Sequence, residues 1–180
     1  RRKRVFFIMF SKKKTEITKS VFEKQILHYI EMEKKKKKRT IKEAIFDLKP
    51  LKPKNIKNNT LLENESFGFF KQLNQQKPSK YVEEINGKTG ASPYIYNHKS
   101  RYNNDRDIKI YSLLKQGGNS ESKEIELLNP YKRRSKIFKD KFYRLKETDV
   151  SKTITAHMKF DCHMYIHPTQ PRGLTPREAA

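Results

Sequence analysis

The sequence predicts an α+β fold that is mostly helical, with long extended basic segments, one long amphipathic β-strand near the C-terminus and a small core. Hydrophobic residues make up 34% of the 180 residues, which is below the usual share for a compact globule. Helical periodicity with capping signals recurs along the chain, and one period-two stretch at 153–167 is typical of a half-buried strand. This combination does not predict a compact enzyme fold.

The charge is strongly unbalanced, with 42 Lys and Arg against 20 Asp and Glu and a net charge of +22. The excess of Lys resembles the codon bias of an AT-rich genome, but that bias would also enrich Glu, so the imbalance remains. Such a charge predicts a polyanionic partner, which can be a nucleic acid, an anionic membrane surface or an acidic protein. No apolar run approaches the roughly 18 residues of a spanning helix. A membrane is not among the expected partners.

Five segments follow from the patterns along the chain. A basic N-terminal arm occupies 1–15, and a helical hairpin occupies 16–49. An extended connector with a basic and aromatic loop occupies 50–107. Helices and the C-terminal strand fill 108–167, and 168–180 is an extended tail with a truncated helix start. That start is predicted from Thr175 as the cap, Pro176 in the first turn and Glu178 at the third position.

The arm is rich in Arg and has no acid before Glu16. That composition resembles a mitochondrial presequence, and it equally resembles a basic arm embedded in RNA. Both interpretations stay open.

The hairpin is predicted from two capping boxes, Ser20 with Glu23 and Thr40 with Glu43, each followed by apolar residues at helical spacing. Pro50 ends the second helix. Between the helices lies a block of six cations, 34–39, which covers every side of a helix and so cannot pack into a core. The block is either a helix end in solvent or a clamp on phosphates.

The connector, residues 50–60, combines two prolines with lysines and has no acid, which indicates an extended basic segment. Residues 86–107 interleave tyrosine rings with cations, as binding of single-stranded or looped RNA requires. Gly87-Lys88-Thr89 is not a phosphate loop, because that loop needs a glycine where Val82 stands.

A basic amphipathic helix is predicted over 131–146. Phe138, Phe142 and Leu145 form a narrow apolar seam, and cations fill most other positions. Such a helix can dock by its seam and present its charges to a polyanion.

The 153–167 stretch alternates apolar and polar residues almost without error. Its histidines and Cys162, the only cysteine, do not match zinc spacings, so no metal site is predicted. No paired carboxylates and no Ser/His/Asp order are found either. The sequence therefore predicts no catalytic residues, no cofactor and no enzyme.

The predicted function is a structural RNA-binding component of a ribonucleoprotein particle, namely a ribosomal protein, plausibly mitochondrial, that binds ribosomal RNA through phosphate contacts. Its expected partners are ribosomal RNA and neighbouring ribosomal proteins, with no small-molecule substrate and no self-association. The alternatives are a basic filament-associated protein, such as one lining microtubules, and an accessory subunit of a mitochondrial membrane complex. The expected location is mitochondrial, or otherwise cytoplasmic.

The candidate RNA-binding residues are the cations and rings of the segments described above. They are Arg1, Arg2, Lys3, Arg4, Lys34, Lys35, Lys36, Lys37, Lys38, Arg39, Tyr94, Tyr96, Lys99, Arg101, Tyr102, Arg106, Lys132, Arg133, Arg134, Lys136, Lys139, Lys141 and Arg144.

Overall fold

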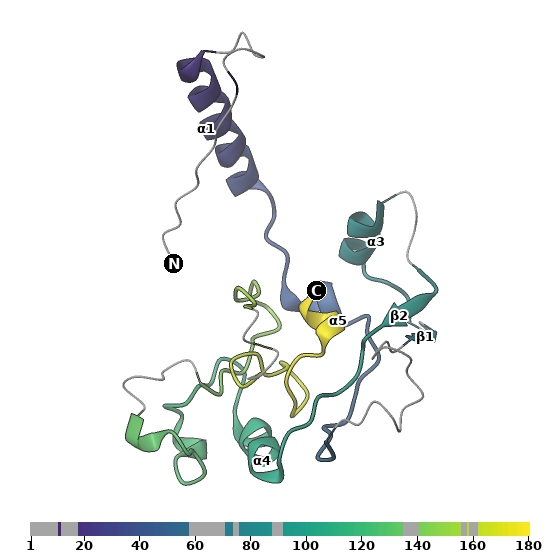
Figure 1. Cartoon of the computed structure of the whole chain (residues 1–180), viewed down its shortest axis with the longest axis vertical. Coiled ribbons are helices and arrows are strands. Elements are labelled where there is room, and N and C mark those ends of the chain that lie inside the picture. Colours follow the sequence, from purple (N-terminus) through teal and green to yellow (C-terminus); the bar gives the residue numbers. More distant parts are fainter. Residues whose placement is uncertain are drawn as a thin grey trace. The chain divides into compact units, whose positions relative to one another are not determined.

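The structure divides into two units, Arg1–Lys38 and Arg39–Ala180, which are described separately. The computed structural model describes residue 11 and residues 18–57, 71–73, 76–87, 92–134, 141–155, 158 and 162–180 (Figure 1). Within these ranges, none of the helices combines the length and apolarity that crossing a bilayer requires.

The first unit contains helix α1, Lys19–Lys35. Its N-cap is Thr18, whose hydroxyl accepts from the Val21 amide, and not Ser20 as the sequence predicted. Lys34 and Lys35 in the last turn complement the negative end of the helix dipole. None of its residues is buried. The helix predicted in the first half of the hairpin is therefore confirmed, and it ends before the cationic block does.

The second unit begins with α2, Ile41–Ile45, where the predicted capping box is confirmed. The Thr40 hydroxyl accepts from the Glu43 amide at 3.2 Å, and the Glu43 carboxylate accepts from the Thr40 amide at 2.8 Å. Helix α3, Lys80–Asn86, is tied to α2 because the Ser79 hydroxyl donates to the Glu43 carbonyl at 2.5 Å.

A small antiparallel sheet pairs β1, Lys71–Leu73, with β2, Tyr94–Tyr96. Ile95 at its centre is buried. β2 lies in the stretch where the sequence showed no strand period, because three residues are too few for a period to register.

Helix α4, Asp105–Leu113, starts at Asn104, whose side chain accepts from the Asp107 amide at 2.9 Å. It buries Ile110 and Tyr111, which belong to one of two apolar clusters. That cluster holds Ile110, Tyr111, Leu114, Ile125, Phe142 and Ile166. The other holds Ile41, Ile45, Leu145, Met158, Tyr165 and Leu174.

The basic helix predicted over 131–146 is not formed at its described residues. A short 3-10 helix, η5 at Lys132–Arg134, is followed after the undescribed residues 135–140 by turn and extended backbone. Phe142 has a φ of 56°, which an α-helix does not allow, and its ring is fully buried. Phe142 and Leu145 are core residues as predicted from the seam, but a turn, and not a helix, brings them there.

The strand predicted over 153–167 is also wrong at its described residues. Thr153–Thr155 and Cys162–Met164 have no strand structure, and Ile166 makes only isolated bridges to Arg144 and Gly173. Residues 165–168 are all buried in succession, whereas a half-buried strand exposes alternate residues. The segment therefore winds through the interior, where it contributes to both apolar clusters.

The C-terminal helix α5, Pro176–Ala179, packs beside α2 (Figure 1) and confirms the helix start predicted at Thr175. Glu178 completes the capping box and also receives two hydrogen bonds from Arg172, at 2.6 and 2.8 Å. Both side chains are almost wholly buried, at 0% and 1% exposed. Burial opposes ionisation of Glu178, but the hydrogen bonds and charge of Arg172 outweigh it and lower the pKa of that carboxyl.

We expect Glu178→Gln to lower the free energy of unfolding by about 3–5 kcal/mol, because it leaves the Arg172 guanidinium buried without a counter-charge. Urea unfolding followed by circular dichroism measures the change. The matched control is Glu126→Gln, which breaks the exposed pair of Glu126 with Lys132 and should cost less than about 1 kcal/mol. Equal losses in the two variants would contradict the importance of the buried pair.

Candidate nucleic-acid interface

Two basic segments about fifty residues apart lie side by side in the structure. Residues 49–55 and 98–104 run parallel and are here called the basic ribbon (Figure 1). The Ser100 hydroxyl donates to the Lys52 carbonyl at 2.6 Å, and the Asn103 amide donates to the Lys54 carbonyl at 2.8 Å. Lys54 also forms a parallel bridge with Tyr102. The ribbon is therefore joined by hydrogen bonds at several points along its length.

Proline keeps the first segment extended. Pro50 and Pro53 fix their own φ angles and push the preceding residues toward extended backbone. A proline has no amide hydrogen, so this segment cannot form a full ladder with a neighbour. Polar side chains from the second segment, such as Ser100, bond its carbonyls instead.

The ribbon concentrates positive charge. Neither segment contains an acidic residue. Lys52 is exposed, while Lys54 and Lys99 are half-buried. Burial lowers the pKa of Lys99, and the like charge of Lys54 lowers it further. Cations held near one another on a hydrogen-bonded frame favour an anionic ligand that offsets their repulsion.

The ring of His98 anchors one end of the ribbon. Its Nε2 lies 2.7 Å from the Lys49 carbonyl oxygen, and its Nδ1 lies 3.2 Å from the Thr175 hydroxyl. A carbonyl only accepts, so we assign the ring proton to Nε2, and Nδ1 then accepts from Thr175. Burial lowers the pKa of His98, which favours this neutral form.

The predicted aromatic and basic loop is partly in this interface. Lys99, Arg101 and Tyr102 belong to the ribbon, and the Arg101 guanidinium donates to the Met158 carbonyl. Tyr94 on β2 is exposed, and Tyr96 is half-buried.

Arg106 lies just beyond the ribbon. It is paired with Asp107 at 3.1 Å. Lys52 and Lys54 were recognised only as part of the basic connector over 50–60, since nothing in the sequence showed which segment lies beside them.

The cations of the predicted basic helix do not form one surface among the described residues. Arg144 donates to the carbonyls of Pro168, Tyr111 and Leu114 at 2.6–2.9 Å, so it holds the core together. Burial lowers the pKa of Lys141, whose ammonium lies 5.6 Å from the centre of the Tyr131 ring.

The described cations at the N-terminal end of the predicted basic helix are exposed. Lys132 pairs with Glu126 at 3.0 Å, and Arg133 is exposed. The side chain of Arg134 lies outside the described part of the chain, as do Lys136 and Lys139.

The six-cation block is divided between the two units. Lys34 to Lys38 are exposed in the first unit, where Lys36 pairs with Glu33 at 2.5 Å. Arg39 belongs to the second unit, where it forms an ion pair with Glu84. Arg1, Arg2, Lys3 and Arg4 lie outside the described residues.

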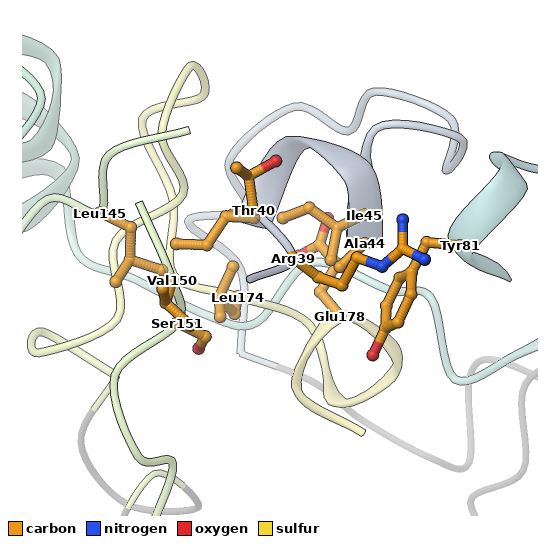
Figure 2. A pocket seen from close by; sticks show the side chains of 11 residues that line it. Arg39, Thr40, Ala44, Ile45, Tyr81, Leu145, Val150, Ser151, Leu174 and Glu178 are labelled. Atoms are coloured by element: carbon orange, nitrogen blue, oxygen red, sulfur yellow. The ribbon is translucent and has the colours of Figure 1, made fainter. Parts of the chain in front are cut away.

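A cavity of about 230 Å³ lies between α2, α3 and the C-terminal segment (Figure 2). Its walls are mainly apolar, and Arg39 lies over the Tyr81 ring, 5.5 Å from its centre, at one end. Among its described lining residues, Glu178 is the only carboxylate, and Arg172 already binds it. The cavity can therefore accept an apolar group but offers no carboxylate for acid–base chemistry.

The buried surroundings of Cys162 indicate a structural role. The thiol is buried, and its sulfur lies 3.5 Å from the Asn103 side-chain nitrogen. A Cβ placed on Gly173 would come within 2.6 Å of that sulfur, so the two residues are in close contact. Within the described ranges, no three His, Cys, Asp or Glu side chains gather as metal ligands.

The basic ribbon is a pair of hydrogen-bonded, cationic segments without an acidic residue. The comparisons with known proteins then give the family. The chain matches the profile of C-5 cytosine-specific DNA methylases over residues 1–180, and it belongs to that family. It is 33% identical over 76 residues to the Type II methyltransferase M.AgeI of Thalassovita gelatinovora. That match covers 42% of this chain but only 17% of the relative. No solved structure matches the chain.

The family membership corrects four predictions. The predicted ribosomal protein with ribosomal RNA as partner is wrong, because the family acts on DNA. The predictions of no enzyme and of no small-molecule substrate are wrong too, since a methylase needs a methyl donor. The positive charge misled because DNA and RNA carry the same phosphate charge. The cellular location is untouched by these findings and stays a prediction.

Acid should destabilise the fold through its buried histidines. Burial lowers the pKa of His167 from 6.5 to about 4. Between these values the His167 ring binds a proton in the unfolded chain but not in the folded chain. The free energy of unfolding therefore falls as pH drops from about 6.5 toward 4. Urea midpoints across this range measure the loss. We expect His167→Gln to reduce its slope by about 1.4 kcal/mol per pH unit, the value for one proton. An unchanged slope would contradict this.

Proposed function

We propose that this chain supplies DNA binding to a cytosine-5 DNA methyltransferase, and that the basic ribbon holds the DNA backbone. The observation that carries the proposal is the family match over the whole chain. The ribbon supports it independently, because its two acid-free segments gather lysines on a hydrogen-bonded frame.

The reaction explains why a backbone-holding surface is needed. The bond between the methyl group and its donor breaks, with the electron pair staying on the donor, while the methyl group forms a bond to C5 of cytosine. The hydrogen on C5 then leaves as a proton. Inside a duplex C5 cannot be reached from all sides, so methyltransferases turn the target base out of the stack. Phosphate contacts then fix the position of the duplex while the base is out. Lys52, Lys54 and Lys99 are placed for such contacts, with Tyr102 beside them.

Cys162 is not the covalent nucleophile in this proposal. Addition of a nucleophile to C6 would activate C5, and a thiolate is suited to that step. The nucleophile must reach the extruded base, whereas the Cys162 side chain is enclosed by Asn103 and Gly173. We therefore assign it to packing.

We expect removal of the ribbon lysines to weaken binding of duplex DNA irrespective of base sequence. For the triple variant Lys52→Ala, Lys54→Ala and Lys99→Ala, the salt slope of log affinity should shrink by about 0.9 for each phosphate that is no longer neutralised. Fluorescence anisotropy with a labelled cytosine-containing duplex at several salt concentrations measures this.

The matched control removes the same charge elsewhere. Lys24, Lys109 and Lys123 are exposed and lie outside the ribbon. Their replacement by Ala should leave most of the slope intact. Equal effects of the two triple variants would show that net charge alone drives binding. If the unaltered chain bound no DNA, the proposed function itself would be wrong.

A further inference from the structure

We propose that His98 is a positioning residue that sets the register of the basic ribbon against the cap of α5, so that the ribbon lysines meet the DNA backbone together. This inference rests on the proposed DNA binding by the ribbon. His98 would touch neither DNA nor the reacting atoms, and it would act through the backbone of Lys49.

A directed chain of hydrogen bonds passes through the ring. The Glu178 amide donates to the Thr175 hydroxyl oxygen at 3.1 Å. The Thr175 hydroxyl donates to Nδ1 of His98 at 3.2 Å, and Nε2–H donates to the Lys49 carbonyl at 2.7 Å. Each group donates to the next one, so the hydrogen bonds run in one direction from the Glu178 amide to the Lys49 carbonyl. A second proton on the ring would remove the acceptor that the Thr175 hydroxyl uses.

His98 joins the two ribbon segments at the end where both begin. It is the first residue of the second ribbon segment, and its partner Lys49 is the first residue of the other. Farther along, the bridge of Lys54 with Tyr102 closes the ribbon. Because Pro50 and Pro53 donate no amide hydrogens, few backbone bonds are possible between these points. Loss of the hydrogen bond from His98 would therefore free the Lys49 end of the proline-containing segment to shift, while the hydrogen bonds to the Lys52 and Lys54 carbonyls hold the rest of it.

The Thr175 end of this series of hydrogen bonds is firmly held. Thr175 is fully buried, and Glu178 is fixed by two hydrogen bonds from Arg172. The Arg177 amide also donates to the Asn97 carbonyl at 3.4 Å, next to His98 in the chain. These hydrogen bonds therefore tie the ribbon to the buried C-terminal segment.

Charged groups surround the ring on several sides. Glu178 has a carboxylate oxygen 4.0 Å from Nδ1, and Arg172, Arg177 and His167 belong to the same C-terminal segment. Asp47, after α2, also interacts with His98. Burial and the two arginines lower the pKa of His98, while the hydrogen bond to the Lys49 carbonyl and the charge of Glu178 raise it, and the net shift is downward. The ring is therefore neutral near pH 7.

Three substitutions separate positioning from charge and from packing. His98→Ala removes both hydrogen bonds. His98→Gln keeps one donor and one acceptor and does not titrate. His98→Asn has the same groups on a side chain one methylene shorter, which does not span from Lys49 to Thr175. None of the three removes a cation that contacts DNA.

We expect His98→Ala and His98→Asn to weaken duplex binding about five- to tenfold and to reduce its salt slope, although every lysine is present. His98→Gln should restore affinity and slope to those of the unaltered chain. Anisotropy titrations give both quantities, and stoichiometric titration gives the active fraction. A loss of folded protein alone would lower that fraction and leave the slope of the active molecules unchanged.

Two outcomes overturn the inference. One is an unchanged slope in both His98→Ala and His98→Asn, and the other is failure of His98→Gln to restore it. If these occur while the triple lysine variant still loses its slope, DNA binding by the ribbon stands and only the role of His98 is wrong. If the unaltered chain shows no salt-dependent DNA binding, both proposals are wrong.

Discussion

The buried ion pair of Arg172 with Glu178 is the interaction on which the second unit depends most. Two charges removed from water are stable only when each satisfies the other with good geometry, and here the contact is bidentate. The same carboxylate closes the capping box of α5 by accepting from the Thr175 amide. The pair therefore fixes the last helix, and through Thr175 and His98 it reaches the basic ribbon.

Local signals in the sequence were reliable where a few adjacent residues decide the structure. The capping boxes at Thr40 and Thr175 are present as predicted, because a capping box depends on a hydroxyl and a carboxylate three residues apart. The pair of Ser20 and Glu23 has the same spacing but does not cap, since α1 already begins after Thr18. The helix over 131–146 and the strand over 153–167 failed for the opposite reason. Their periodic patterns record which side chains are buried, and Phe142 and Ile166 are buried by a turn and a winding segment.

The two segments of the basic ribbon lie far apart in the sequence and were recognised by different patterns. A proline-rich basic connector and a loop of rings and cations were each recognised, but their adjacency depends on contacts such as that of Ser100 with the Lys52 carbonyl. Those contacts join residues about fifty positions apart, and no periodicity reports them. Charge alone indicated a polyanion, and it could not distinguish DNA from RNA because phosphates are common to both.

The close contact of Cys162 with Gly173 couples two positions that are distant in the sequence. Any side chain at 173 would occupy the space of the thiol, so larger residues are tolerated at one position only if the other is reduced. Because the sulfur of Cys162 is buried, its alkylation can report local opening of the structure. A thiol-alkylating reagent reaches it only when the structure around it opens, and the labelling rate therefore measures how often that opening occurs.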